Sequence, residues 1–215
     1  MFSRSSRRGA VACRRGFFDK VGRDWERAWT ENVTPWELQS VNPSFVEGLA
    51  LLPKTRNARR VLVPGCGSGF DLLHLHANGW EATGLDISHT AIDIARKNVG
   101  DDVDLQQGDF FTYAAAPPFD VIYDYLFFAA IDPSMRPACA VQFHALLQPT
   151  TGRLLTLLFP LAPPSADGPP YTLTLDVYKE IFGRVGLTLE STHVPTQSIK
   201  PRKGRELLAV WSRAE

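Results

Sequence analysis

The chain has 215 residues, of which 44% are hydrophobic, so it can bury the core of one sizeable globular domain. Its 23 lysines and arginines balance 23 aspartates and glutamates, and this zero net charge argues against a general nucleic-acid binder. No apolar run approaches the ~18–20 residues that a membrane span requires. The three cysteines are far apart and form no CxxC pair, which suggests neither a disulfide framework nor a zinc site and indicates a reducing compartment.

The first 18 residues differ in composition from the rest of the chain, with five arginines, three serines and no acidic residue. This composition is typical of a mitochondrial transit peptide, although a disordered basic tail would look the same. We therefore leave residues 1–18 out of the fold, and we expect a cytoplasmic protein with mitochondrial import as the alternative. Residues 19–215 form one expected domain, with lid helices over 19–52 and a core over 60–215.

The predicted elements alternate between helices and strands along the chain. Apolar residues spaced by three and four predict a helix over residues 18–29 and a short helix over 45–52 with Ser44 as its N-cap. Further helices are predicted after the first strand up to Gly79, from Ser88 to Gly100, over 135–147 and over 177–185. The predicted strands cover residues 61–63, 81–87, 103–107, 120–123, 153–159, 187–194 and 206–212.

This alternation predicts βαβ units, and therefore a parallel sheet with helices on both faces. The basic turn over residues 200–205 predicts a hairpin, so that the last strand runs antiparallel to its neighbour. Five of the eleven residues from 160 to 170 are prolines, which predicts a stiff loop at the carboxyl end of the fifth strand. Ligands of open α/β sheets bind at that edge.

A glycine-rich turn follows the first strand directly and opens a helix. Its glycines at positions 65, 67 and 69 allow a sharp turn and a close approach of the backbone to a ligand. Asp86 lies 21 residues after Gly65, at the end of the second strand, where a carboxylate can accept hydrogen bonds from both ribose hydroxyls. The alternative role for Asp86 is a helix N-cap, which Ser88 already fills. The pattern favours a nucleoside-bearing ligand.

The residues around the turn distinguish between nucleoside cofactors. The NAD fingerprint requires a glycine at position 70, where this chain has Phe70. Asp71 follows, and it could reach an ammonium group, which favours a nucleoside that carries an amino acid. At the end of the third strand, Asp109 could accept from an adenine amine while Phe110 lines the adenine face. The alternative for Asp109 is an ordinary loop residue.

Three tryptophans, Trp25, Trp29 and Trp36, fall within twelve residues, and the first two share a helix face. Ordinary core packing is one interpretation. The other is an aromatic wall over a cationic sulfonium, which aromatic faces attract by ~0.5–2 kcal/mol.

Together these motifs resemble those of S-adenosylmethionine-dependent methyltransferases, specifically the plant and fungal thiol/halide branch of the thiopurine methyltransferase family. The resemblance extends from about Trp25 to Trp211, and it rests on WERAW…TPW, VLVPGCGSGFD, GLDIS, GDFF, FDVIYDYLFFAAIDPSMRP, TGRLLTLLFP, GPPY and PRKGRE. It implies a Rossmann-like class I methyltransferase with a seven-stranded, mostly parallel sheet and S-adenosyl-L-methionine as the cofactor. The cofactor contacts that it implies are Trp25, Trp29, Trp36, Gly65, Asp86, Asp109, Phe110 and Tyr125.

The resemblance also separates two branches of that family. The thiopurine branch looks like PLCGKS at the glycine turn and has Asp-Arg where this chain has Asp124-Tyr125. The difference implies a small thiol, thiocyanate or halide as the acceptor. A thiopurine or aromatic thiol is the alternative acceptor, and a non-catalytic cofactor-binding scaffold is the alternative of another class. The segment before Trp25 is shorter than the resemblance to the plant members of the family implies.

For such an acceptor we expect in-line displacement at the sulfonium methyl without a general base, because a thiolate or halide is already nucleophilic. Catalysis would come from alignment and from removal of water from the acceptor. We expect an aromatic pocket for the acceptor, lined by the tryptophans together with Tyr125, Phe127 and Phe128. Tyr125 is expected to position the acceptor in it. We expect Cys66 to pack in the interior. We also expect a monomer without a metal site that binds neither nucleic acid nor membrane.

Overall fold

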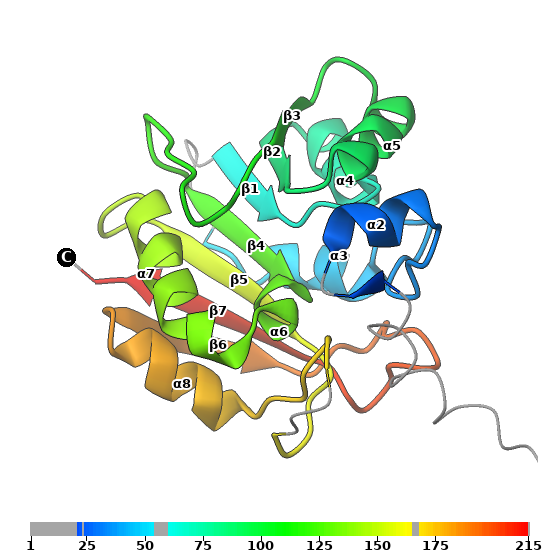
Figure 1. Ribbon diagram of the computed structural model, residues 1–215. Coiled ribbons are helices and arrows are strands. Elements are labelled where there is room, and N and C mark those ends of the chain that lie inside the picture. Colours follow the sequence, from blue (N-terminus) through cyan, green and yellow to red (C-terminus); the bar gives the residue numbers. More distant parts are fainter. Residues whose placement is uncertain (1–20, 23, 54–59, 165–167, 215) are drawn as a thin grey trace, which may run out of the picture.

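The computed structural model describes residues 21–22, 24–53, 60–164 and 168–214 (Figure 1). The predictions for residues 1–18, and for the start of the first helix, lie outside the described residues. The strands are β1 (Arg60–Pro64), β2 (Glu81–Asp86), β3 (Asp104–Gln107), β4 (Val121–Tyr125), β5 (Arg153–Leu158), β6 (Leu187–His193) and β7 (Leu207–Arg213). The helices are α2 (Trp25–Thr30), α3 (Pro43–Leu49), α4 (Phe70–Ala77), α5 (His89–Val99), α6 (Phe127–Ala130), α7 (Arg136–Leu146), α8 (Leu175–Gly183) and the 3-10 helix η1 (Pro133–Met135).

The seven strands form one sheet in the order β3-β2-β1-β4-β5-β7-β6 (Figure 1). Strands β1 to β5 pair in parallel, and β7 is antiparallel to both β5 and β6. The predicted hairpin and the antiparallel last strand are therefore confirmed. None of the helices that the structure describes is long and apolar enough to cross a membrane.

Two apolar clusters cover the two faces of the sheet. Along β5 the side chains alternate between them, since Leu154 and Leu158 belong to one cluster and Leu155 and Leu157 to the other. The first cluster also contains residues of α7 and α8, and the second contains residues of α3, α4 and α5. The predicted arrangement with helices on both faces is confirmed (Figure 1).

Helix α3 lies in the core, whereas the sequence predicted it as part of a lid. Its Phe45 is fully buried and stacks on Tyr123 of β4, with ring centroids 4.0 Å apart. Gly48 allows α3 to lie close to the sheet, because a Cβ at this position would be only 2.8 Å from a methyl carbon of Leu208 in β7. The predicted N-cap is also wrong: the side chain of Asn42 caps the helix, and Ser44 instead donates to Glu206 at 2.9 Å.

The segment before α7 is more structured than the sequence predicted. Strand β4 turns at Leu126, which has a φ of 63°, into the four-residue helix α6, and η1 then leads into α7. Asp124 stabilises the turn by accepting a hydrogen bond from the backbone N–H of Phe128 at 2.9 Å. Asp132 caps η1 in the same way at Ser134. Both helices are too short to show an apolar periodicity.

The contrast between two neighbouring side chains of α3 tests whether this helix belongs to the core. We predict that Phe45→Ala lowers the free energy of unfolding by about 3–5 kcal/mol, because it removes a buried ring and leaves a cavity. Val46→Ala, at a position that is 38% exposed on the same helix, should change it by less than about 0.5 kcal/mol. Denaturant unfolding measures both, and equal effects would contradict the placement of α3 in the core.

Candidate functional site

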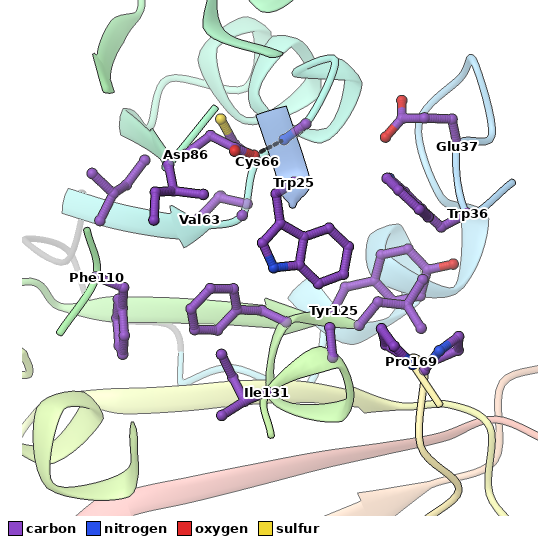
Figure 2. Close-up of a pocket in the computed structure, with 18 of the residues that line it drawn as sticks. Trp25, Trp36, Glu37, Val63, Cys66, Asp86, Phe110, Tyr125, Ile131 and Pro169 are labelled. Atoms are coloured by element: carbon purple, nitrogen blue, oxygen red, sulfur yellow. Dashed lines mark hydrogen bonds between the residues drawn. The ribbon is translucent and has the colours of Figure 1, made fainter. Parts of the chain in front are cut away.

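A cavity of about 650 Å³ opens at the carboxyl ends of strands β1 to β4 (Figure 2). This is the edge at which ligands of open α/β sheets bind. Pro169 and Pro170 of the proline-rich loop contribute to its wall, as the position of that loop predicted. All eight residues that the resemblance implied as cofactor contacts line this one cavity, namely Trp25, Trp29, Trp36, Gly65, Asp86, Asp109, Phe110 and Tyr125.

The glycine-rich turn after β1 brings bare backbone to the cavity wall. Gly65, Gly67 and Gly69 have φ values of 61°, 53° and 81°, a conformation that side chains with a Cβ rarely adopt. A Cβ on Gly67 would lie 2.6 Å from a carboxylate oxygen of Glu37 and 3.2 Å from the indole ring of Trp29. Glycine therefore lets the Glu37 carboxylate and the Trp29 ring, which both line the cavity, lie directly against the turn.

Asp86 ends β2 beside this turn, and its carboxylate holds the turn in place. One oxygen accepts from the backbone N–H of Gly67 at 3.1 Å, and the other accepts from that of Ser88 at 2.9 Å. Burial raises the pKa of Asp86, and these two hydrogen bonds oppose the rise. Each carboxylate oxygen has two lone pairs, so both can accept one more hydrogen bond. The N-cap alternative for Asp86 is wrong, because the Ser88 hydroxyl caps α5 at Ala91.

Asp109 and Phe110 follow β3 at the same edge. A carboxylate oxygen of Asp109 accepts from the backbone N–H of Phe111 at 2.9 Å, so this side chain also stabilises its own loop. The Phe110 ring is 3% exposed and makes an edge contact with Phe127, with centroids 4.9 Å apart. Both residues contribute to the cavity wall.

The three tryptophans come together in space as well as in sequence. Trp36 makes edge contacts with Trp25 and Trp29, with centroid distances of 5.6 and 6.2 Å. All three line the cavity, and none belongs to the two clusters that cover the sheet. Trp25 and Trp36 pack against a separate small cluster of Val21 and Ala28. The aromatic wall that the spacing predicted is therefore present, outside the main core.

Tyr125 and Phe127 lie on either side of the Leu126 turn, and both line the cavity. The Tyr125 hydroxyl is buried and finds no hydrogen-bond partner among the residues that the structure describes. Phe128, predicted for the same pocket, is fully buried in the sheet cluster against Tyr178. The prediction for Phe128 is wrong because the helical turn of α6 directs neighbouring side chains to different sides.

One residue of the cavity wall and one residue behind it were not identified from the sequence. Glu37 lines the cavity, accepts a hydrogen bond from Ser68, and has a pKa that burial raises. Arg202, from the turn between β6 and β7, stacks on the ring of Tyr125 at 5.1 Å and donates to the carbonyl of Trp36 at 3.0 Å. Arg202 belongs to the PRKGRE motif of the resemblance, and Glu37 directly follows its TPW motif. Both residues lie in loops, which give no periodic signal in the sequence.

Asp71 and Cys66 complete the wall near the glycine turn. Asp71 accepts from the backbone N–H of Asn42 at 2.8 Å, and burial raises its pKa to about 7. Cys66 packs, as predicted, against the apolar cluster that contains residues of α3, α4 and α5, and it also lines the cavity. Burial raises the pKa of its thiol, so the thiol is neutral. Within the described part of the chain, no three His, Cys, Asp or Glu side chains are grouped so as to hold a metal ion.

The charge of the wall indicates the charge of the ligand. Among the described residues that line the cavity there are carboxylates and no lysine, arginine or histidine; the acids are Glu37, Asp71, Asp86, Asp109 and Asp132. Asp86 is buried and Glu37, Asp71 and Asp132 are half-buried, and carboxylates removed from water are costly without a compensating positive charge. A cationic ligand with hydroxyl and amine donors therefore suits these carboxylate acceptors. S-adenosylmethionine, with its sulfonium, ammonium and ribose hydroxyls, is such a ligand.

Comparisons with known proteins agree with this geometry. The sequence model of the family "Thiopurine S-methyltransferase (TPMT)" matches residues 21–213. "Thiocyanate methyltransferase 1" and "Probable thiol methyltransferase 2", both of Arabidopsis thaliana, are 35% identical over 196 and 195 residues, which is 88% of this chain and 84% of each relative. "Thiopurine S-methyltransferase" of Pseudomonas fluorescens is 29% identical over 178 residues, or 74% of this chain and 80% of that protein.

A solved structure supports the fold at lower identity. The Burkholderia thailandensis 1,6-didemethyltoxoflavin-N1-methyltransferase, with bound S-adenosylhomocysteine, superposes with a TM-score of 0.70 at 17% identity, covering 96% of this chain and 93% of that chain. The fold is that of the class I methyltransferases, as predicted. The chain belongs to the thiopurine S-methyltransferase family and is an S-adenosylmethionine-dependent methyltransferase.

Proposed function

We propose that this enzyme methylates a small, soft nucleophile, namely a thiol, thiocyanate or a halide. The observation that carries the proposal is Tyr125 at the end of β4, in the cavity wall. By the resemblance described above, the thiopurine branch looks like Asp-Arg where this chain has Asp124-Tyr125. The arginine would suit a larger acceptor with polar groups, whereas a phenol ring suits a small polarisable one. The names and the higher identity of the two plant relatives support the same choice.

The cavity wall divides into parts that suit the parts of the cofactor. We assign Asp86 to the ribose hydroxyls, and Asp109 with Phe110 to the adenine. Asp71 lies beside the glycine turn and suits the ammonium group.

When bound, the cofactor supplies a methyl group on a positively charged sulfur, which a soft nucleophile takes by in-line displacement. The residues of this chain contribute binding and orientation. The indole rings of Trp25, Trp29 and Trp36 offer aromatic faces to the positive charge. Tyr125, covered by the Arg202 guanidinium on its other side, limits the space left for the acceptor and orients it. Exclusion of water by these rings raises the reactivity of an anionic acceptor, so no general base is required.

A panel of acceptors tests the proposal. Methyl transfer from radiolabelled S-adenosylmethionine is measured with bisulfide, thiocyanate, iodide, thiophenol and a thiopurine. The proposal predicts kcat/KM values for bisulfide and thiocyanate at least about tenfold above that for the thiopurine, which corresponds to about 1.4 kcal/mol of transition-state binding. A thiopurine that ranks first would instead support the aromatic-thiol alternative.

The assignment of Asp86 predicts a loss of cofactor affinity on substitution. Asp86→Ala removes a charged acceptor for two hydroxyls, and hydrogen bonds to charged groups are worth about 1.5–3 kcal/mol, so the Kd for S-adenosylhomocysteine should rise roughly 10- to 100-fold. Asp93→Ala, which removes an exposed carboxylate from α5, is the matched control and should leave the Kd unchanged. Calorimetry on the folded variants measures both. An unchanged Kd in Asp86→Ala would remove this residue from the cofactor site.

A reaction without a general base, as we propose it, predicts different pH profiles for two kinds of acceptor. A thiol with a pKa of about 8.5 is only ~3% thiolate at pH 7, so its turnover should rise about tenfold per pH unit between pH 6 and 8. Thiocyanate is charged throughout this range and should give an almost flat profile. Because Asp71, with a pKa of about 7, would affect both acceptors alike, the ratio of the two rates isolates the acceptor. Parallel profiles would show that a protein group takes the proton.

A further inference from the structure

Helix α2 carries two of the three cavity tryptophans, and none of its residues belongs to the two apolar clusters that cover the sheet. Its buried Ala28 belongs to the small cluster with Val21, which Trp25, Val33 and Trp36 surround. This cluster is separate from the two that cover the sheet. Since burial of apolar area is what usually fixes a helix on a domain, and α2 contributes to neither sheet cluster, we expect polar contacts to add to the fixing of α2.

Glu26 provides such a contact, between α2 and the start of α5. Its carboxylate accepts from the Ser88 hydroxyl at 2.6 Å and from the backbone N–H of Thr90 at 3.2 Å, and its other oxygen accepts from the Thr90 hydroxyl. The hydrogen bonds from Ser88 and Thr90 lower the pKa of Glu26, so the carboxylate is ionised near neutral pH. A negative charge is also favoured at the N-terminal end of a helix by the helix dipole.

Ser88 connects this contact to the cofactor end of the cavity. The Ser88 hydroxyl that donates to Glu26 also caps α5, and the Ser88 backbone N–H donates to Asp86 at 2.9 Å. In α2, Glu26 follows Trp25 directly and precedes Trp29 by three residues, and both tryptophans line the cavity. Ser88, the N-cap residue of α5, thus contacts both Glu26 of α2 and Asp86 at the end of β2.

We propose that Glu26 is a positioning residue that fastens α2 to the N-terminus of α5 and thereby holds Trp25 and Trp29 against a cofactor bound at Asp86. The inference rests on the proposed cofactor contacts of these three residues, and not on the identity of the acceptor. Glu26 does not itself line the cavity, so it acts on cofactor affinity through the wall. The contacts of Glu37 with Ser68 and of Arg202 with Trp36 hold the loop after α2, whereas Glu26 lies on the helix itself.

A pair of charge-removing variants on the same helix tests the proposal. Glu26→Gln keeps the size of the side chain but removes its charge, whereas Glu31→Gln removes the charge of a carboxylate that pairs within α2 with Arg27. We expect the Kd for S-adenosylhomocysteine, measured by calorimetry, to rise about tenfold in Glu26→Gln and less than twofold in Glu31→Gln. Amide hydrogen exchange over residues 25–30 should be faster in Glu26→Gln than in the unchanged protein, also without ligand.

A second pair of variants keeps the test decisive if Glu26→Gln disturbs folding. Thr90→Val removes the hydroxyl that donates to Glu26, and Thr90→Ser keeps it, so the valine variant should weaken binding and the serine variant should restore it. A lower Tm with an unchanged Kd in Glu26→Gln would show that the contact serves only the fold and would overturn the proposal. Equal effects of Glu26→Gln and Glu31→Gln would overturn it too. These binding and exchange measurements contain no acceptor, so they do not depend on which acceptor the enzyme uses. A wrong acceptor assignment would be detected only by the acceptor panel.

Discussion

Parallel strands end at a common edge of the sheet, and the first four strands of this sheet each deliver one part of the cavity to that edge. β1 leads into the glycine turn, β2 ends at Asp86, β3 leads to Asp109, and β4 ends at Tyr125. The hydrogen bond from Gly67 to Asp86 then locks the first two parts together. The cavity exists because the order β3-β2-β1-β4 places these four ends side by side.

The charges of the site suit the cofactor and the acceptor in different ways. The wall carries acids without lysine, arginine or histidine among its described residues, so a cationic cofactor relieves the cost of burying those carboxylates. An anionic acceptor, in contrast, meets aromatic rings and the positive charge of the cofactor. Arg202 lies behind the Tyr125 ring and is itself buried, where it adds positive potential without entering the wall.

The sequence was sufficient for the parts of the molecule that have a local or periodic signal. The strands, the glycine turn, Asp86 at the end of β2 and the Ser88 cap follow from patterns within about thirty residues, and the structure places them as predicted. Phe128 was assigned to the wrong side because the Leu126 turn, which adopts a left-handed conformation, starts a helix too short to be recognised. Helix α3 was taken for a lid because the stacking of Phe45 on Tyr123 joins residues that are far apart in the sequence. Glu37 and Arg202 were missed for the same reason.

A crystal structure of the enzyme with S-adenosylhomocysteine tests the site most directly. The account predicts that both ribose hydroxyls donate to the Asp86 carboxylate, which keeps its hydrogen bonds from Gly67 and Ser88, and that the indole rings of Trp25 and Trp29 lie against the cofactor sulfur. A nucleoside bound away from the end of β2, with Asp86 in contact only with backbone N–H groups, would contradict it.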